Sequence, residues 1–240
     1  MGRGHAVRAP ALILVLSVLA PLSAEAGYRF EDGYYLGSAT LLPDWADTLK
    51  RVQRERPLLR RCLADAERCP SHLRGVGALL DRIHALSLDR QIRAVNRYVN
   101  NRRYRGDRSG TVTSALSSDT VTVPSRWSTL GEFLRRGGDC EDYATSKYQL
   151  LRALGVPASE LRVVVVLDRA TREHHAMLAV RRPDEENAWL LDSDDQIHRG
   201  HPFGYRFIYA LNETSIWDHE LDNDAWARKT SLQEQTEEAS

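Results

Sequence analysis

Apolar residues recur every three or four positions in three stretches of the N-terminal half, and this spacing predicts helices. The stretches run from residue 44 to 63, from 73 to 86 and from 89 to 104. Charged residues occupy the opposite side of each stretch, as expected for helices that pack on a shared core. Pro57 lies inside the first stretch and predicts a kink or a break there.

A polar segment at 105–126 follows and predicts a surface loop. A short helix is expected next at 127–136, with Ser128 or Thr129 as its N-cap. A glycine pair then leads to Cys140, which opens a further helix that ends before Gly155.

The C-terminal half reads differently, because short runs of β-branched and aromatic residues replace the helical spacing. Short connections make consecutive strands antiparallel neighbours. Helices first and strands second indicate an α+β domain, with N-terminal helices packed on a mainly antiparallel sheet. The expected strands are 161–167, 174–180, 188–192 and 205–211.

The N-terminus reads as a targeting segment. A basic start precedes a ten-residue apolar run at 11–20, and Ala24-Glu25-Ala26 is a small-x-small cleavage site. An uncleaved anchor is the alternative, but a spanning helix needs about 20 apolar residues. We therefore expect a signal peptide at 1–26, one domain at 27–217 and a flexible polar tail at 218–240.

Composition narrows the function classes. The chain has 240 residues, 42% of them hydrophobic and 28% charged, which suits one soluble globular domain. The formal net charge is zero, whereas nucleic-acid binders usually carry a basic excess. Nucleic acid is therefore not an expected partner.

The chain has three cysteines. Cys62 and Cys69 are seven residues apart and form the natural disulfide in an oxidising compartment, which would contribute about 2–3 kcal/mol to stability. Cys140 is left over, and an odd cysteine in an exported protein is either a reactive thiol or an intermolecular link.

The position of Cys140 favours a reactive thiol. A first helical turn stabilises negative charge, and a histidine within reach, oriented by a carboxylate, would complete the activation of the thiol. His174 and His175 open one strand and Asp192 closes the next, so antiparallel pairing can place them side by side. Each residue also has a purely structural interpretation, as a core cysteine, a strand histidine or a turn aspartate.

The acidic neighbours of Cys140 pose a problem, because negative charge raises the pKa of a thiol. Asp139 could cap the helix and form a capping-box-like pair with Asp142. Alternatively, Asp139, Glu141 and Asp142 could bind Ca²⁺. A zinc site at Cys140, His174, His175 and Asp192 is a weaker alternative, since no Cys-x₂-Cys or His-x₃-His spacing is present.

These residues resemble a family, the bacterial transglutaminase-like cysteine peptidases. The resemblance lies in residues 137–144, 151–157 and 175–178 and in Leu191-Asp192, and it extends to residues 95–100 and 211–213 and to Trp127. It covers most of the mature chain. Two departures are Leu130, which stands near the place of a common proline, and the His174-His175 doublet.

The resemblance implies a papain/transglutaminase-like fold and acyl transfer through a thioester. Cys140 would be the nucleophile, His175 the base and Asp192 its orienter. The spacing to the following leucine favours His175 over His174. The Cys140 backbone N–H would hold the oxyanion, with Trp127 as a candidate second donor or simply a core aromatic.

The resemblance also implies a periplasmic, calcium-dependent endopeptidase with Asp139 and Glu141 as the main ligands, Asp142 as a further one, and no organic cofactor. Its expected substrate is a large surface adhesin, which links the protein to biofilm attachment, and an inner-membrane receptor would sequester it. The alternatives are an amidase or transglutaminase acting on another exported or cell-wall amide, and a non-enzymatic binding module of the same fold.

Overall fold

The structure, a computed structural model, describes residues 27–106, 112–113, 120–121, 126–200, 202 and 204–221. The expected signal peptide at 1–26 lies outside the described residues, and so does the expected tail from residue 222 onward. None of the helices in the described part is long and apolar enough to cross a membrane.

The helices agree with the apolar spacing. Pro57 lies inside an uninterrupted α1, so the chain is not broken there. Thr129 is the N-cap of α4: its hydroxyl accepts from the Glu132 N–H, and the Glu132 carboxylate accepts from the Thr129 N–H. The α-helices of the described residues are α1 (Pro43–Ala64), α2 (Arg74–Ile83), α3 (Leu88–Asn100), α4 (Leu130–Arg136) and α5 (Cys140–Ala153).

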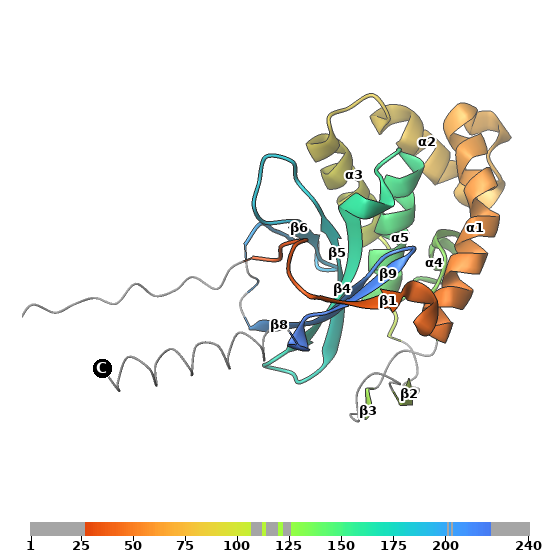
Figure 1. Cartoon of the computed structure of the whole chain (residues 1–240). Coiled ribbons are helices and arrows are strands. Elements are labelled where there is room, and N and C mark those ends of the chain that lie inside the picture. Colours follow the sequence, from red (N-terminus) through yellow and green to blue (C-terminus); the bar gives the residue numbers. More distant parts are fainter. Residues whose placement is uncertain are drawn as a thin grey trace, which may run out of the picture.

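A seven-stranded antiparallel sheet forms the other layer, in the order β1-β9-β8-β4-β5-β6-β7 (Figure 1). A separate two-stranded ribbon, β2 with β3, lies inside the expected loop. The strands are β1 (Tyr34–Ser38), β2 (Val112–Thr113), β3 (Thr120–Val121), β4 (Leu161–Asp168), β5 (His174–Val180), β6 (Trp189–Leu191), β7 (Ile197–His198), β8 (Tyr205–Leu211) and β9 (Ser215–Asp218).

The strand order corrects one expectation. β4, β5 and β6 are consecutive antiparallel neighbours as expected, but β8 pairs with β4 and not with β6. The short β7 occupies the free edge of β6, so β8 crosses to the open edge of β4. β1, β7 and β9 were not expected, because strands of two to five residues carry too little alternation to detect.

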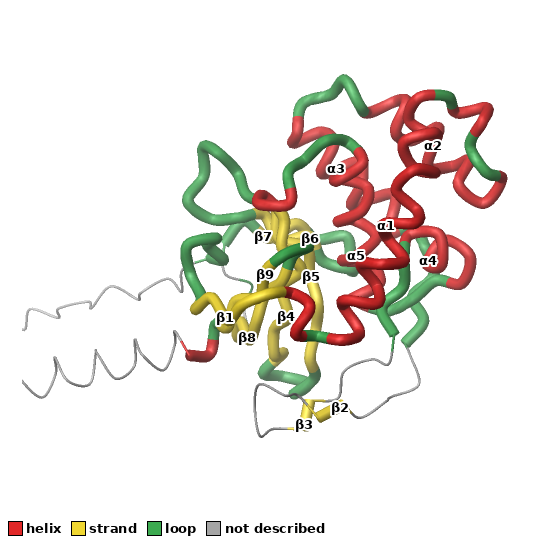
Figure 2. The backbone as a smooth tube through the Cα atoms, turned by 45° about the vertical axis from the view of Figure 1, so that its right-hand side comes forward, coloured by secondary structure: helices red, strands yellow, loops and turns green. Residues whose placement is uncertain are grey.

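The central strand β4 is buried on both faces of the sheet. The helices cover one face, as the view in Figure 2 shows. On the other face Tyr28 and Phe30 pack on Val164 and Val166 of β4, while Val163 and Val165 face the helical core. The continuous apolar run of β4 is thus explained by burial on both sides.

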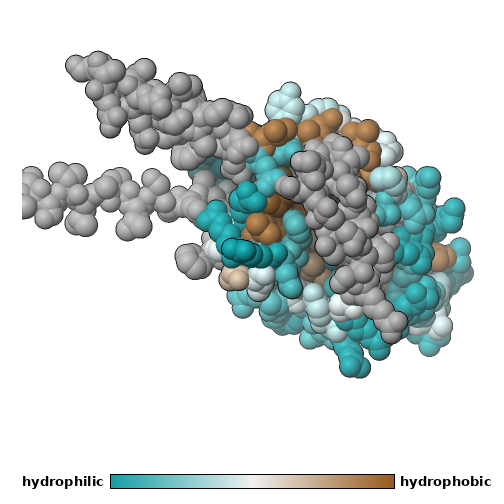
Figure 3. All heavy atoms as spheres, turned by 90° about the horizontal axis from the view of Figure 1, so that it is seen from below, coloured by the Kyte–Doolittle hydropathy of each residue, from teal (hydrophilic) through white to brown (hydrophobic). Residues whose placement is uncertain are grey.

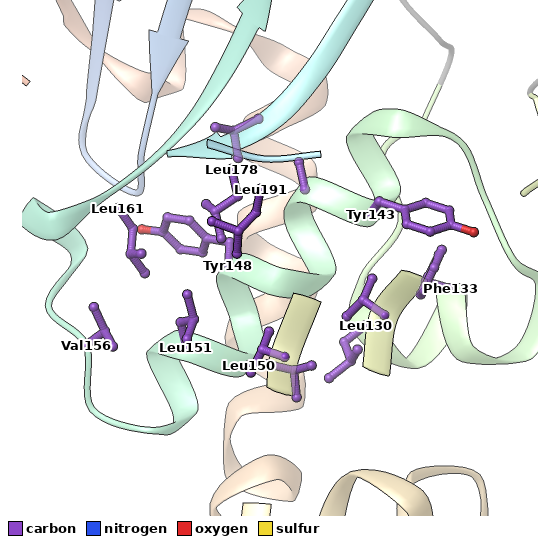
Figure 4. Close-up of a cluster of buried hydrophobic side chains, with 14 of the residues drawn as sticks. Leu130, Phe133, Tyr143, Tyr148, Leu150, Leu151, Val156, Leu161, Leu178 and Leu191 are labelled. Atoms are coloured by element: carbon purple, nitrogen blue, oxygen red, sulfur yellow. The ribbon is translucent and has the colours of Figure 1, made fainter. Parts of the chain in front are cut away.

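α5 is the centre of the helical core. All of its residues from 141 to 151 are buried. In Figure 4, Leu150 and Leu151 of α5 lie in the same cluster as Leu178 of the sheet and Leu130 of α4. The outer surface is different, because hydrophilic residues predominate on the face in Figure 3 and hydrophobic ones gather in limited areas. The helix that begins with Cys140 is therefore held rigidly between the sheet and the other helices.

The expected disulfide is present. Cys62 near the end of α1 is bonded to Cys69, and both residues are buried. Cys140, only partly buried, is the free cysteine.

Candidate active site

Close packing fixes the glycine pair before Cys140. Gly137 has a φ of 73°, and a Cβ there would lie 2.3 Å from the Arg103 carbonyl oxygen. A Cβ at Gly138 would lie 2.0 Å from the Asp142 carboxylate. Neither position has room for a side chain. The glycine pair therefore allows close packing just before α5, whose first residue is Cys140.

The predicted side-chain capping of α5 by Asp139 and Asp142 is wrong. Asp139 is the N-cap residue, but its side chain makes no capping hydrogen bond. Asp142 does not pair with it in a capping box either, because its Oδ1 accepts from the Ser128 backbone N–H at 2.5 Å. The segment before α4 packs against the start of α5, and that tertiary contact supplies the donor.

The thiol of Cys140 lies between α5 and β5. Sγ donates to Oε2 of Glu141 at 3.2 Å, and it also accepts a hydrogen bond from the Ala176 backbone N–H. Burial and the Glu141 carboxylate raise the pKa of Cys140 well above its usual value, against the smaller opposing effect of the Ala176 bond. The thiol of Cys140 thus contacts the residue that directly follows His175 in β5. Its proton is directed at Glu141.

His175 and Asp192 are bonded to each other. His175 opens β5 and Asp192 directly follows β6, and His175 Nε2 lies 2.6 Å from Asp192 Oδ1. A neutral ring that donates through Nε2 keeps its lone pair on Nδ1, available to a proton donor. His174 is exposed. The structure therefore brings His175, and not His174, to the carboxylate.

Asp192 is embedded among hydrogen-bond donors. Oδ1 also accepts from the Ser193 backbone N–H at 2.6 Å, and Oδ2 lies 3.4 Å from Nε2 of His198. Burial would raise the pKa of Asp192, but the hydrogen bond with His175 and the close approach of His198 outweigh it and hold that pKa well below its usual range. The same pairing with Asp192 raises the pKa of His198.

The two candidate oxyanion donors, the Trp127 indole and the Cys140 backbone N–H, have different surroundings. Trp127 is 4% exposed and packs edge-on against Trp45, and its indole N–H has no hydrogen-bond partner among the described residues. The backbone N–H of Cys140 donates to the Tyr104 hydroxyl. The structure thus places Trp127 as a core aromatic with an unused donor, and it brings Tyr104 to Cys140, which the sequence did not indicate.

The acidic turn 139–142 is buried. Asp139, Glu141 and Asp142 are exposed by 6%, 2% and 2%. Burial and the neighbouring Asp139 carboxylate, which is hydrogen-bonded to Glu141, raise the pKa of Glu141 to about 9. One Glu141 oxygen, Oε1, has no hydrogen-bond partner within the described part of the chain.

A second group of acidic side chains lies in the turn that follows β6. Among the described residues, the ligand atoms of Asp192, Asp194 and His198 all lie within 4.8 Å of one another, which would suit a metal. Both carboxylate oxygens of Asp192, however, already contact histidines. The side chains of the acidic turn 139–142 do not form such a converging group, but Glu141 keeps an unbonded carboxylate oxygen within the described residues.

Sequence reasoning missed three residues that surround Asp192. Lys147 and Asn100 both donate to its backbone carbonyl, at 2.6 and 2.8 Å, and His198 meets its carboxylate. Lys147 could have been found, because a lysine seven residues after Cys140 lies on the same face of the helix. His198 carried no such signal, since it belongs to a strand of two residues.

Comparison with known proteins identifies the class. A family model described as "Bacterial transglutaminase-like cysteine proteinase BTLCP" matches residues 60–224. Of the curated proteins compared, none matches. The chain belongs to the bacterial transglutaminase-like cysteine proteinases, and it is a transglutaminase-like cysteine peptidase.

Solved structures agree on the fold. Calcium-bound LapG of Legionella pneumophila is 24% identical over 72% of this chain and 88% of that one, with a TM-score of 0.53. An EGTA-treated LapG is 24% identical over 67% and 84%, with a TM-score of 0.52. A third LapG structure is 23% identical over 74% and 96%, with a TM-score of 0.53. The expected transglutaminase-like α+β fold is confirmed.

Proposed function

We propose that this peptidase cuts protein substrates with a Cys140–His175–Asp192 triad, in the periplasm and with calcium bound. The observation that carries the triad is the 2.6 Å bond between His175 Nε2 and Asp192 Oδ1 beside the helix that Cys140 opens. A base oriented by a carboxylate next to a thiol is the arrangement that nucleophilic acyl transfer requires.

In the proposed reaction, Nδ1 of His175 takes the thiol proton and Sγ of Cys140 attacks the scissile carbonyl. The tetrahedral intermediate places its oxyanion at the Cys140 backbone N–H, where it would replace the Tyr104 hydroxyl as the acceptor. The unpartnered Trp127 indole N–H is the candidate second donor. The intermediate collapses to a thioester while His175 protonates the leaving amine, and water then releases the acid.

Calcium fits the acidic turn 139–142. Three carboxylates buried within four residues are costly unless protons or a cation neutralise them, and Glu141 offers an oxygen without a hydrogen-bond partner. Asp139 and Glu141 are the proposed main ligands, with Asp142 as a further one. The bound ion would supply positive charge beside the thiol. The calcium-bound and EGTA-treated LapG structures support the idea.

The substrate follows from the resemblance to LapG-type proteases. We propose a large exported adhesin as substrate, so that the enzyme affects biofilm attachment, and an inner-membrane receptor as a regulatory partner. The segment at 1–26 would act as the signal peptide that directs export.

The test compares mature protein (residues 27–240) with its Cys140→Ala variant. Each is incubated in calcium with the exported proteome of the source organism, and new N-termini are sequenced. We expect new N-termini in a large surface protein with the wild type alone. Equal cleavage by Cys140→Ala would refute the nucleophile, and acyl transfer to amines without new N-termini would favour the transglutaminase alternative. A peptide spanning the cleavage site then serves as substrate.

A further inference from the structure

Lys147 is buried without an evident structural need. It lies in the middle of α5, two turns after Cys140, and its side chain is 0% exposed. Burial lowers the pKa of Lys147 to about 7, although the nearby carboxylates of Asp192, Asp194 and Asp195 oppose this effect. A fully buried amine is costly unless its donors are used, so its contacts indicate what it does.

Those contacts converge on the residue that orients His175. Nζ of Lys147 donates to the backbone carbonyl of Asp192 at 2.6 Å and approaches that of Leu191 at 3.5 Å. Asn100 of α3 donates to the same Asp192 carbonyl at 2.8 Å. A carbonyl oxygen has two lone pairs, and here two side-chain donors from two helices occupy them.

The turn held in this way closes the hairpin of β6 and β7. Asp192 lies beyond the β6 ladder and is tied to its own turn by a bond from its N–H to the Gln196 carbonyl. Asp195 adopts a positive φ of 74°, and Asn96 of α3 donates to its carbonyl at 3.1 Å. The helices that flank the sheet therefore hold the backbone of this turn in place, in addition to the hairpin itself.

We propose that Lys147 is a positioning residue that ties the Cys140 helix to Asp192 and thereby sets the orientation of the His175 ring toward the thiol. The inference rests on the proposed triad. Because α5 carries both Cys140 and Lys147, one rigid element fixes the nucleophile and the turn that orients its base. A displacement of about 1 Å at such a site can cost about 100-fold in rate.

The test uses mature protein in calcium chloride and two readouts. One is the second-order rate of Cys140 alkylation by iodoacetamide from pH 5 to 9, and the other is the melting temperature. We expect Lys147→Met to slow alkylation at pH 7 by about tenfold or more. The rise of the rate with pH should shift to higher pH, because a displaced His175 ring accepts the thiol proton less well. The melting temperature should stay or rise, because methionine fills the space without a buried amine.

Gln149→Met is the matched control. Gln149 is 2% exposed on the same helix, and its amide donates to the Thr145 carbonyl within α5. It should keep the wild-type alkylation profile. A wild-type rate and pH profile in Lys147→Met would overturn the proposal.

If Lys147→Met also lowers the melting temperature, the double variant Lys147→Met/Asp192→Asn separates a positioning role of Lys147 from a general loss of stability. If Lys147 acts through Asp192, Lys147→Met adds no further loss of alkylation in an Asp192→Asn background. A full additional loss would refute the proposal. The triad is tested separately. Wild-type alkylation rates in both Asp192→Asn and His175→Ala would reject the triad itself. Slower alkylation in these two variants, together with a wild-type rate in Lys147→Met, would reject only the role of Lys147.

Discussion

Cys140 lies near two acidic turns, the α5 turn (residues 139–142) and the β6 turn (residues 192–195), each with three carboxylates. In the β6 turn, His175 and Ser193 meet one oxygen of Asp192, and Nε2 of His198 lies 3.4 Å from the other. In the α5 turn, carboxylates face one another. Asp139 hydrogen-bonds Glu141, and Glu141 leaves one buried oxygen without a partner within the described residues.

The pKa values separate the two turns. Histidine donors hold the pKa of Asp192 well below its usual range, whereas burial and Asp139 raise that of Glu141 to about 9. The β6 turn thus stabilises its negative charge with the protein's own groups. In the α5 turn, Glu141 keeps a buried oxygen without a partner among the described residues, and this oxygen favours the calcium site that we propose there. The difference shows that a carboxylate's neighbours, and not its burial alone, decide which role it can take.

The largest expected loss of activity follows substitution of His175, the partner of Asp192. His175→Ala removes the base and should lower cleavage of the identified peptide by about 10³-fold or more. His174→Ala should leave it unchanged, because this ring is exposed and starts the same strand without meeting Asp192. Equal losses in the two variants, measured as kcat/KM, would contradict the assignment of the base.

Asp192→Asn should come next, with a loss of about 100-fold or more in kcat and a small change in KM. Asparagine keeps the size of the side chain but removes the charge that orients and stabilises a protonated His175. Asp194→Asn, in the same turn and exposed, is the control and should retain activity. An Asp192→Asn enzyme with normal kcat would show that the β6 turn is only structural.

Measurements of thermal stability should show which of the two turns binds calcium, without an activity assay. Calcium chloride should raise the melting temperature of the wild type and of Asp192→Asn alike, and EGTA should reverse the rise. Glu141→Gln should lose most of this response, because it removes a ligand charge. A calcium response that survives in Glu141→Gln and disappears in Asp192→Asn would move the site to the β6 turn.

The smallest effect concerns stability and pH. Because its folded pKa is lowered, Asp192 stabilises the protein above its unfolded pKa of about 4, and this contribution is lost as pH falls toward the folded value. Asp192→Asn should therefore cost about 1–3 kcal/mol at pH 7 and progressively less below pH 4. Urea unfolding at several pH values measures the difference, and a constant difference down to pH 2 would contradict the hydrogen-bonded carboxylate.

Local patterns gave most of the elements. The spacing of apolar residues predicted α1, α2 and α3, and the β-branched run predicted a buried β4. The pairing of β5 with β6 followed from their short connection. The position of β8 did not, because hydrogen-bonding edges were available on more than one strand and only β7 decided which edge remained open.

The chain's own sequence determined where Cys140, the proposed nucleophile, stands: it is the first residue of a helix and follows a glycine pair without room for side chains. Only the tertiary structure decided what surrounds it. Asp142 bonds Ser128 fourteen residues away, and Lys147 reaches Asp192 forty-five residues away. Helix starts follow from neighbouring residues, whereas these donors are chosen by the packing of separate segments, which no local pattern encodes.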